Sequence, residues 1–301
     1  MTTAAASTPL TLTAAARSDV GQVRATNQDF AYAGPLAGRG RWHLLAVADG
    51  VGGNAGGEWA SQTAVETLMR DLVIPDGGTP AEALAGAVQD ANRAVYSAAA
   101  QRPQYSGAST TLVAAAVLDH RMWWANVGDS RLYLVRSGVA EQLTADHSWV
   151  AEQVRAGRIT ADEAAQSDQR NVITRSVGFE PRVTVDTGGP VDLLEGDVVL
   201  LCSDGLHGLV GDEEIATTAS AVPPSQAAER LIALANGRGG TDNITVVIGR
   251  LDVSRPLVDT TRRVPQRRPG GRRRILVAVI VTVVALACGV AAWFAVPGVP
   301  F

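Results

Sequence analysis

The chain has 301 residues with 26 basic and 30 acidic side chains, a length that is high for one domain but within the usual range. Residues 259–274 hold seven arginines and one aspartate, so residues 1–258 carry 19 basic against 29 acidic side chains. The acidic balance of this larger part argues against binding to polyanions and favours a site that collects cations.

Residues 1–13 are predicted to be a flexible N-terminus, and they lack the basic region and long apolar core of a signal peptide. Apolar and β-branched runs predict strands at 41–48, 110–118, 121–127, 131–136, 183–187, 197–202 and 243–252. Alanine-rich segments with apolar spacing of three and four predict helices at 57–73, 80–100, 147–156 and 225–236.

The connections between neighbouring strands indicate how the sheets are built. Only a few residues join the runs between positions 110 and 136. Such short connections predict antiparallel hairpins, because parallel strands need a long crossover.

The last part of the chain predicts a membrane anchor. Residues 253–274 read as an Arg- and Pro-rich juxtamembrane linker, and residues 275–296 are 22 residues without a charge, enough to cross a bilayer. The positive-inside rule then keeps the arginines and the larger N-terminal part in the cytoplasm and leaves residues 297–301 as an extracytoplasmic tail. The arginine run also favours anionic lipid head groups, whereas a nucleic-acid role is excluded because the run abuts the membrane and lacks interleaved aromatic residues.

The stretch ADGVGGNAGGEWA supports two interpretations. Residues 50–55 fit the G-x-G-x-x-A form of a dinucleotide-binding loop between a predicted strand and a predicted helix. Alternatively, Asp49 is a metal ligand and the glycines let the backbone pass close to the ion. A carboxylate directly ahead of a pyrophosphate would repel it, which weakens the first interpretation.

Four further aspartates lie at places of the same kind, next to apolar runs and small or amide residues: Asp29, Asp129, Asp204 and Asp242. Carboxylates that converge on one cleft repel each other unless divalent cations hold them. All-oxygen ligands suit Mg²⁺ or Mn²⁺, and the four scattered histidines disfavour zinc. Neither a G-x-S-x-G nor a Ser-x-x-Lys motif is present to support a serine nucleophile.

Six short motifs occur in the order and approximate spacing of one known family: RATNQD, ADGVGG followed by GGE, STT, VGDSR, CSDGL and GTDNIT. Through them residues 14–252 resemble the bacterial metal-dependent protein phosphatases of the protein phosphatase 2C type. The resemblance implies an α+β fold, a four-layer α-β-β-α sandwich of two antiparallel sheets flanked by helices. With the predicted C-terminal transmembrane helix, this is the architecture expected for the whole chain.

The resemblance also implies the ligands of two core ions, Mn²⁺ or Mg²⁺. Asp49 would bridge the two ions and the carbonyl of Gly50 would bind one of them. Asp204 and Asp242 would hold the other ion, and Asp29 would support it. A water shared by the ions would then attack the phosphorus.

Three more positions acquire expected roles from the resemblance. Arg24 would clamp the substrate phosphate, Asp129 would bind a third, weaker ion, and Asn171 would lie on a mobile flap that approaches this ion. The sequence departs from the family at Asn54, where a histidine is usual, and at Ser109, where a glycine is common. The departure at Asn54 leaves any proton relay through that position in doubt.

The leading hypothesis is therefore a single-pass protein of the cell membrane with a cytoplasmic catalytic domain. It would hydrolyse phosphoserine and phosphothreonine in phosphorylated proteins and oppose a Ser/Thr protein kinase. Two alternatives stay open, a catalytically inactive regulatory binding module at the membrane and a dinucleotide-binding enzyme. The sequence does not indicate the oligomeric state.

Overall fold

The computed structural model describes residues 10–53, 55–74 and 78–253. Four predicted features lie outside the described residues: the linker at 253–274 beyond its first residue, the transmembrane helix at 275–296, the tail at 297–301 and the family departure at Asn54. Within the described ranges, none of the helices combines the length and apolar character needed to cross a bilayer.

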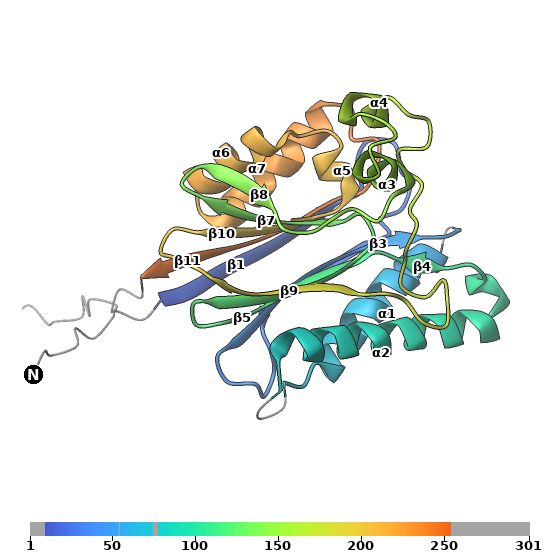
Figure 1. Ribbon diagram of the computed structural model, residues 1–301, viewed down its shortest axis with the longest axis horizontal. Coiled ribbons are helices and arrows are strands. Elements are labelled where there is room, and N and C mark those ends of the chain that lie inside the picture. Colours follow the sequence, from blue (N-terminus) through green and yellow to red (C-terminus); the bar gives the residue numbers. More distant parts are fainter. Residues whose placement is uncertain (1–9, 54, 75–77, 254–301) are drawn as a thin grey trace, which may run out of the picture. The chain divides into compact units, whose positions relative to one another are not determined.

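Two antiparallel sheets form the centre of the structure (Figure 1). The first sheet has the order β1-β11-β10-β7-β8, with bounds Leu10–Asp19, Ile244–Val253, Val198–Cys202, Arg131–Arg136 and Val139–Gln142. The second has the order β2-β3-β5-β6-β9, with bounds Asp29–Pro35, Trp42–Val51, Leu112–Leu118, Arg121–Val127 and Asp186–Asp192. The short strand β4, Ser109–Thr110, pairs with the end of β3.

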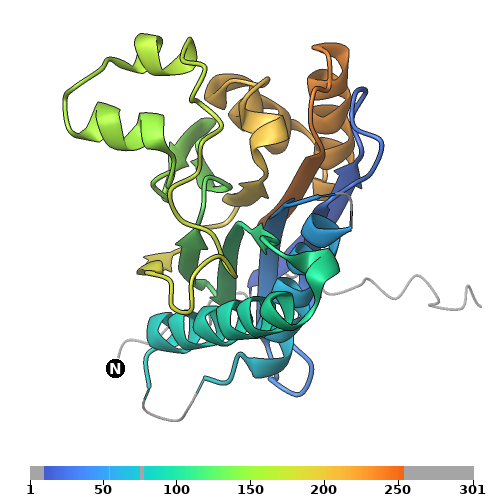
Figure 2. The ribbon, with the colours of Figure 1, turned by 90° about the vertical axis from the view of Figure 1, so that its right-hand side faces the viewer.

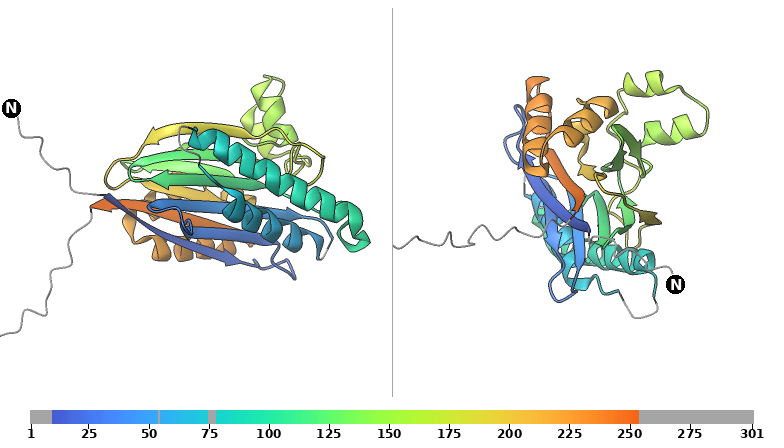
Figure 3. Two further views of the ribbon diagram at one scale, coloured as in Figure 1. Left: turned by 90° about the horizontal axis from the view of Figure 1, so that it is seen from below. Right: turned by 90° about the vertical axis from the view of Figure 1, so that its left-hand side faces the viewer.

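Helices cover the outer faces of both sheets (Figures 1 and 3). Helices α1 (Gly56–Asp71) and α2 (Pro80–Gln101) pack on the second sheet, and a short 3₁₀ helix, Pro103–Tyr105, follows α2. Helices α5 (Asp204–His207), α6 (Asp212–Ala221) and α7 (Pro224–Gly237) lie on the first sheet. The predicted sandwich of two antiparallel sheets flanked by helices is confirmed.

The alternation of side chains along the strands explains why both sheets are covered on two sides. In β3, Leu44 and Ala46 belong to the core beneath α1 and α2, whereas Leu45 and Val47 belong to the core between the sheets. Successive strand residues point to opposite faces, so a strand that is apolar at every position has to be buried on both.

The structure corrects the sequence-based assignment in several places. Strand β1 begins at Leu10, within the segment predicted to be flexible, and Leu10 pairs with Val253 of β11. The sequence did not predict strands β1, β2 and β8, because they are rich in alanine or in charged residues. It also did not predict helices α4, α5 and α6, because they are short or polar. Strand β9 covers Asp186–Asp192 instead of the predicted 183–187, and it extends past the predicted end because Gly188, Gly189 and Pro190 read as a turn in the sequence.

The dinucleotide-binding interpretation does not fit the topology. Strand β3, which leads into the glycine-rich loop, pairs antiparallel with both β2 and β5. A dinucleotide fold needs a parallel βαβ unit at this place.

Residues 149–172 form an excursion that we call the flap, and its helices α3 (Trp149–Arg155) and α4 (Ala161–Ala165) project from the sandwich (Figure 2). The base of the flap is closed by an antiparallel bridge between Ser148 and Ile173 and by a 2.8 Å hydrogen bond from the Trp149 amide to the Val172 carbonyl. Each helix is capped by a side chain that precedes it, Ser148 for α3 and Thr160 for α4.

Candidate active site

The ends of the strands bring the predicted acidic residues to one end of the sandwich. Asp29 begins β2 and Asp49 lies near the end of β3, and the register of these strands places the two residues directly opposite each other. Asp129 follows β6, Asp204 follows β10, and Asp242 precedes β11. In antiparallel sheets the end of one strand lies beside the start of the next, so these five positions converge.

A pocket of about 220 Å³ lies at this end. Seven of the eight predicted site residues line it: Arg24, Asp49, Gly50, Asp129, Asn171, Asp204 and Asp242. The eighth, Asp29, is 8% exposed, and its Oδ2 accepts a 2.8 Å hydrogen bond from the Ser203 hydroxyl. Asp29 therefore supports the pocket from the protein interior.

Ionisation of the carboxyl groups in and beside this pocket is unfavourable, because they are buried close together. Burial raises the pKa of Asp29 to about 7, and the charges of Asp204 and Asp242 add to the effect. Burial, followed by the charges of Asp29 and Asp204, raises the pKa of Asp49 well above its usual value. The pKa of Asp129 rises to about 8 through burial and the nearby Asp204. Such a cluster favours an added positive charge.

The donor set fits divalent metal ions. The Oδ1 atoms of Asp29 and Asp204 are buried without a hydrogen-bond partner, and hard cations such as Mg²⁺ and Mn²⁺ prefer carboxylate oxygens. Within the described ranges, no three His, Cys, Asp or Glu side chains are already grouped as ligands of one ion.

Gly50 and Gly57 permit a close backbone approach beside Asp49. A Cβ on Gly50 would lie 2.2 Å from the carbonyl oxygen of Gly57, and a Cβ on Gly57 would lie 2.8 Å from the carbonyl oxygen of Gly50. Glycine is therefore required at both positions by packing, and the carbonyl of Gly50 stays at the edge of the pocket.

Several residues that hold the site were not assigned a site role from the sequence. The side-chain oxygen of Asn243 accepts a 2.8 Å hydrogen bond from the Gln28 amide, and its NH₂ group donates to the carbonyls of Val20 and Thr26. Asn243 thus fixes the loop that carries Arg24, rather than capping its own turn. The hydroxyl of Thr111 accepts a 2.9 Å bond from the Asp49 amide.

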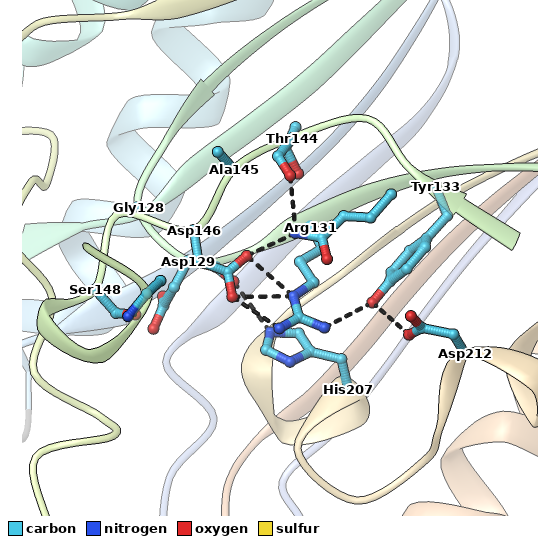
Figure 4. A network of polar contacts seen from close by, with 12 residues as sticks. Gly128, Asp129, Arg131, Tyr133, Thr144, Ala145, Asp146, Ser148, His207 and Asp212 are labelled. Atoms are coloured by element: carbon cyan, nitrogen blue, oxygen red, sulfur yellow. Dashed lines mark hydrogen bonds and ion pairs between the residues drawn. The ribbon is translucent and has the colours of Figure 1, made fainter. Parts of the chain in front are cut away.

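A buried polar network lies behind Asp129 (Figure 4). The guanidinium of Arg131 donates to both carboxylate oxygens of Asp146, at 2.8–3.1 Å, and to the hydroxyl of Tyr133. The Tyr133 hydroxyl in turn donates to Asp212 at 3.0 Å, and His207 Nε2 donates to the carbonyl of Asp129 at 3.0 Å. This network ties the Asp129 turn to the first sheet and to helix α5.

A histidine at the base of the flap holds the same turn from the other side. His147 is buried, its Nδ1 accepts a 3.1 Å hydrogen bond from the Gly128 amide, and its Nε2 lies 3.0 Å from Asp186 Oδ2. The first contact requires an unprotonated Nδ1, in agreement with burial that lowers the pKa of His147. Only the fold reveals this contact, because residues 128 and 147 belong to different segments.

The raised carboxyl pKa values predict a pH-dependent stability. In the metal-free protein, Asp29 and Asp129 have pKa values of about 7 and 8, against roughly 3.9 in an unfolded chain. The folded state therefore binds more protons, and stability is lost as the pH rises through these values. We expect Tm to fall between about pH 6.5 and 8.5, and Mg²⁺ to raise Tm by more at the higher pH.

Differential scanning calorimetry with and without Mg²⁺ checks this prediction. Burial lowers the pKa of His207 to about 4. The stability that it contributes is therefore constant above roughly pH 6.5 and does not change Tm over the range tested. Asp29→Asn should weaken the pH dependence. A metal-free Tm that stays constant or rises over this range would contradict the prediction.

The sandwich fold and the oxygen-lined pocket together define a candidate metal-dependent phosphatase. The chain belongs to the protein phosphatase 2C family, whose family model matches residues 15–244. It is 40% identical over 242 residues to the serine/threonine protein phosphatase PstP of Mycobacterium tuberculosis, a match that covers 79% of this chain and 45% of PstP. It is 37% identical over 235 residues to the protein phosphatase PhpP of Streptococcus pneumoniae, a match that covers 77% of this chain and 94% of PhpP. The matched region is thus less than half the length of PstP.

Solved structures agree with the fold. The crystal structure of the M. tuberculosis phosphatase PstP/Ppp has a TM-score of 0.71 and 40% identity, covering 80% of this chain and 99% of that one. The catalytic domain of PstP in complex with two manganese ions has a TM-score of 0.70 and 38% identity, covering 81% and 99%.

Proposed function

We propose that the chain is a metal-dependent protein phosphatase that hydrolyses phosphoserine and phosphothreonine in proteins. The observation that carries the proposal is the convergence of Arg24 and four aspartates on one pocket, at the end of a sandwich shared with bacterial Ser/Thr phosphatases. The names of the relatives PstP and PhpP support this substrate class.

The pocket offers ligands for two Mn²⁺ or Mg²⁺ ions. Asp49 would contribute to both ions, the Gly50 carbonyl would bind one of them, and Asp204 and Asp242 would bind the other, with Asp29 behind them. The two manganese ions in the PstP complex support this assignment. Bound ions would supply activation of water as a nucleophile and neutralisation of the phosphate charge.

Arg24 is placed to bind the phosphate. Its Nη2 donates to Asp242 Oδ2 at 2.7 Å, and half of its side chain is exposed. A guanidinium carries five N–H donors, so this bond leaves donors that can bind phosphate oxygens. The contact to Asp242 also holds the guanidinium beside the candidate metal ligands.

Asp129 and Asn171 are proposed to serve a third, weaker ion. Both residues line the pocket, and Asn171 comes from the flap while Asp129 comes from the end of β6. A change in the position of the flap would therefore change the distance between these two residues.

The experiment that tests the function is hydrolysis of a phosphothreonine peptide by the full-length protein. Phosphate release should require Mn²⁺ or Mg²⁺, stop when EDTA is added and return when excess metal is restored. Turnover that persists in EDTA would refute the metal-dependent mechanism. If calorimetry finds no Mn²⁺ binding and no turnover occurs, the regulatory binding module is the better description.

We further propose that the protein is anchored in the cell membrane by residues 275–296 with its catalytic domain in the cytoplasm, where it opposes a Ser/Thr protein kinase. The uncharged 22-residue segment and the seven arginines that precede it support the anchor. Fractionation of cells that express the full chain tests the anchor, and recovery in the soluble fraction would refute it. Phosphoproteins that fail to accumulate when the gene is deleted would argue against the opposition to a kinase.

A further inference from the structure

A second pocket of about 340 Å³ opens beside the candidate active site, and we call it the side pocket. The two pockets share Val51, which follows the metal-ligand segment of β3, and Ile173, at the base of the flap. Phe179 and Val183 of the segment after the flap also line the side pocket. It therefore adjoins the pocket in which the phosphate is proposed to bind.

The wall that carries Phe179 is fixed to the body of the domain. The side chain of Asn92, fully buried on α2, accepts a 2.7 Å hydrogen bond from the Gly178 amide and donates at 2.9 Å to the Glu180 carbonyl. Gln89, one turn earlier on α2, donates to the carbonyl of Val183. These bonds hold the backbone on both sides of Phe179.

Gly178 strengthens this attachment. Its φ of +91° lies in the region that favours glycine, and a Cβ would lie 2.2 Å from Cγ1 of Val95 on α2. The segment thus packs directly against the helix. Phe179 therefore lies on a backbone segment that is hydrogen-bonded to α2 and packed against it.

The lining of the side pocket is mixed, and its apolar part comes from Val51, Ile173, Phe179 and Val183. Phe179 is 67% exposed and Val51 is 41% exposed, although both side chains favour burial. Single exposed apolar residues are common, but here two of them share a concave site with Ile173.

Charges at the side pocket nearly balance. Arg175 is paired with Asp186 at 2.9 Å, and the remaining charged lining residues, Glu180 and Arg182, have opposite signs. The side pocket therefore has no large excess of one charge, in contrast to the acidic pocket of the candidate active site, and its apolar side chains offer contacts to an uncharged, apolar group.

We propose that the side pocket binds the substrate polypeptide next to the phosphorylated residue and takes one large apolar side chain between Val51, Ile173 and Phe179. The inference rests on the proposed function. A phosphorylated residue in the catalytic pocket has chain on both sides of it, and each extended residue advances about 3.3–3.6 Å. The side pocket shares lining residues with the pocket of the candidate active site. One of the first few substrate residues on one side of the phosphorylated residue can therefore reach it.

The test uses the full-length protein with Mn²⁺ and phosphothreonine peptides built from Ala, Ser and Gly. A single Leu is moved one position at a time along both sides of the phosphothreonine, and the same peptide with Ala at that position is the reference. We expect Leu at one or two neighbouring positions on one side to raise kcat/KM about 5- to 10-fold over the reference. Phe179→Ser should bring this ratio close to one.

Val139→Ser is the matched control, since Val139 is 68% exposed on β8 and does not line the side pocket. It should keep the wild-type ratio. A ratio near one at every Leu position in the wild type, or a preference that persists in Phe179→Ser, overturns this inference while the phosphatase function stands. Absence of hydrolysis of both the peptides and p-nitrophenyl phosphate overturns the proposed function and this inference with it.

Discussion

Asp49→Asn is expected to lower kcat/KM for a phosphothreonine peptide by at least about 1,000-fold, equivalent to roughly 4 kcal/mol of transition-state stabilisation. Asp49 lies opposite Asp29 in the sheet and shares its pocket with Asp204 and Asp242. The substitution keeps the shape of the side chain but removes the central negative charge that would bind the ions. Phosphate release at saturating Mn²⁺ measures the effect.

The same variant should be at least as stable as the wild type when no metal is present. Burial and neighbouring carboxylates raise the pKa of Asp49, so its ionised form is unfavourable in the metal-free fold. A calorimetric scan in EDTA therefore separates loss of function from loss of folding. Asp71→Asn, on the exposed end of α1, is the matched control and should retain activity. Wild-type activity in Asp49→Asn would exclude Asp49 as a metal ligand.

Arg131→Met is expected to destabilise the domain by about 3–5 kcal/mol, because it leaves Asp146 buried without its charge partner. The side chains of Arg131 and Asp146 are only 22% and 12% exposed, and the pair is further bonded to Tyr133. For a domain of this size the loss corresponds to a decrease in Tm of roughly 6–20 °C. Thermal unfolding monitored by circular dichroism measures it.

Arg70→Met is the control for the loss of an Arg–Asp pair on the surface. Arg70 donates to both oxygens of Asp71 at 2.8 Å, but its side chain is 66% exposed. Water screens the charges of such an exposed pair, so its loss should change Tm little. Equal shifts for the two variants would show that the buried network behind Asp129 does not stabilise the fold.

Both the fold class and the convergence of the aspartates could be predicted before the structure. Strands β6 and β7 have the predicted bounds, since each is a mostly apolar run bounded by turn residues. The motifs around Asp49, Asp204 and Asp242 are short and local, so they are readable as sequence. By contrast, β1 and β2 contain many alanines and were missed, although β1 pairs with β11 over ten residues.

The acidic character of the larger part of the chain, the apolar C-terminal segment and the candidate metal ligands can be read directly from the amino-acid sequence. These properties belong to individual residues or to short stretches, so no other part of the chain alters them. The three-dimensional structure was needed to show that Asp29 faces Asp49, that Asn243 holds the Arg24 loop, and that Phe179 lies beside the pocket of the candidate active site. Strand register and loop anchoring depend on contacts between residues far apart in the chain, and those contacts exist only after the sheets have packed.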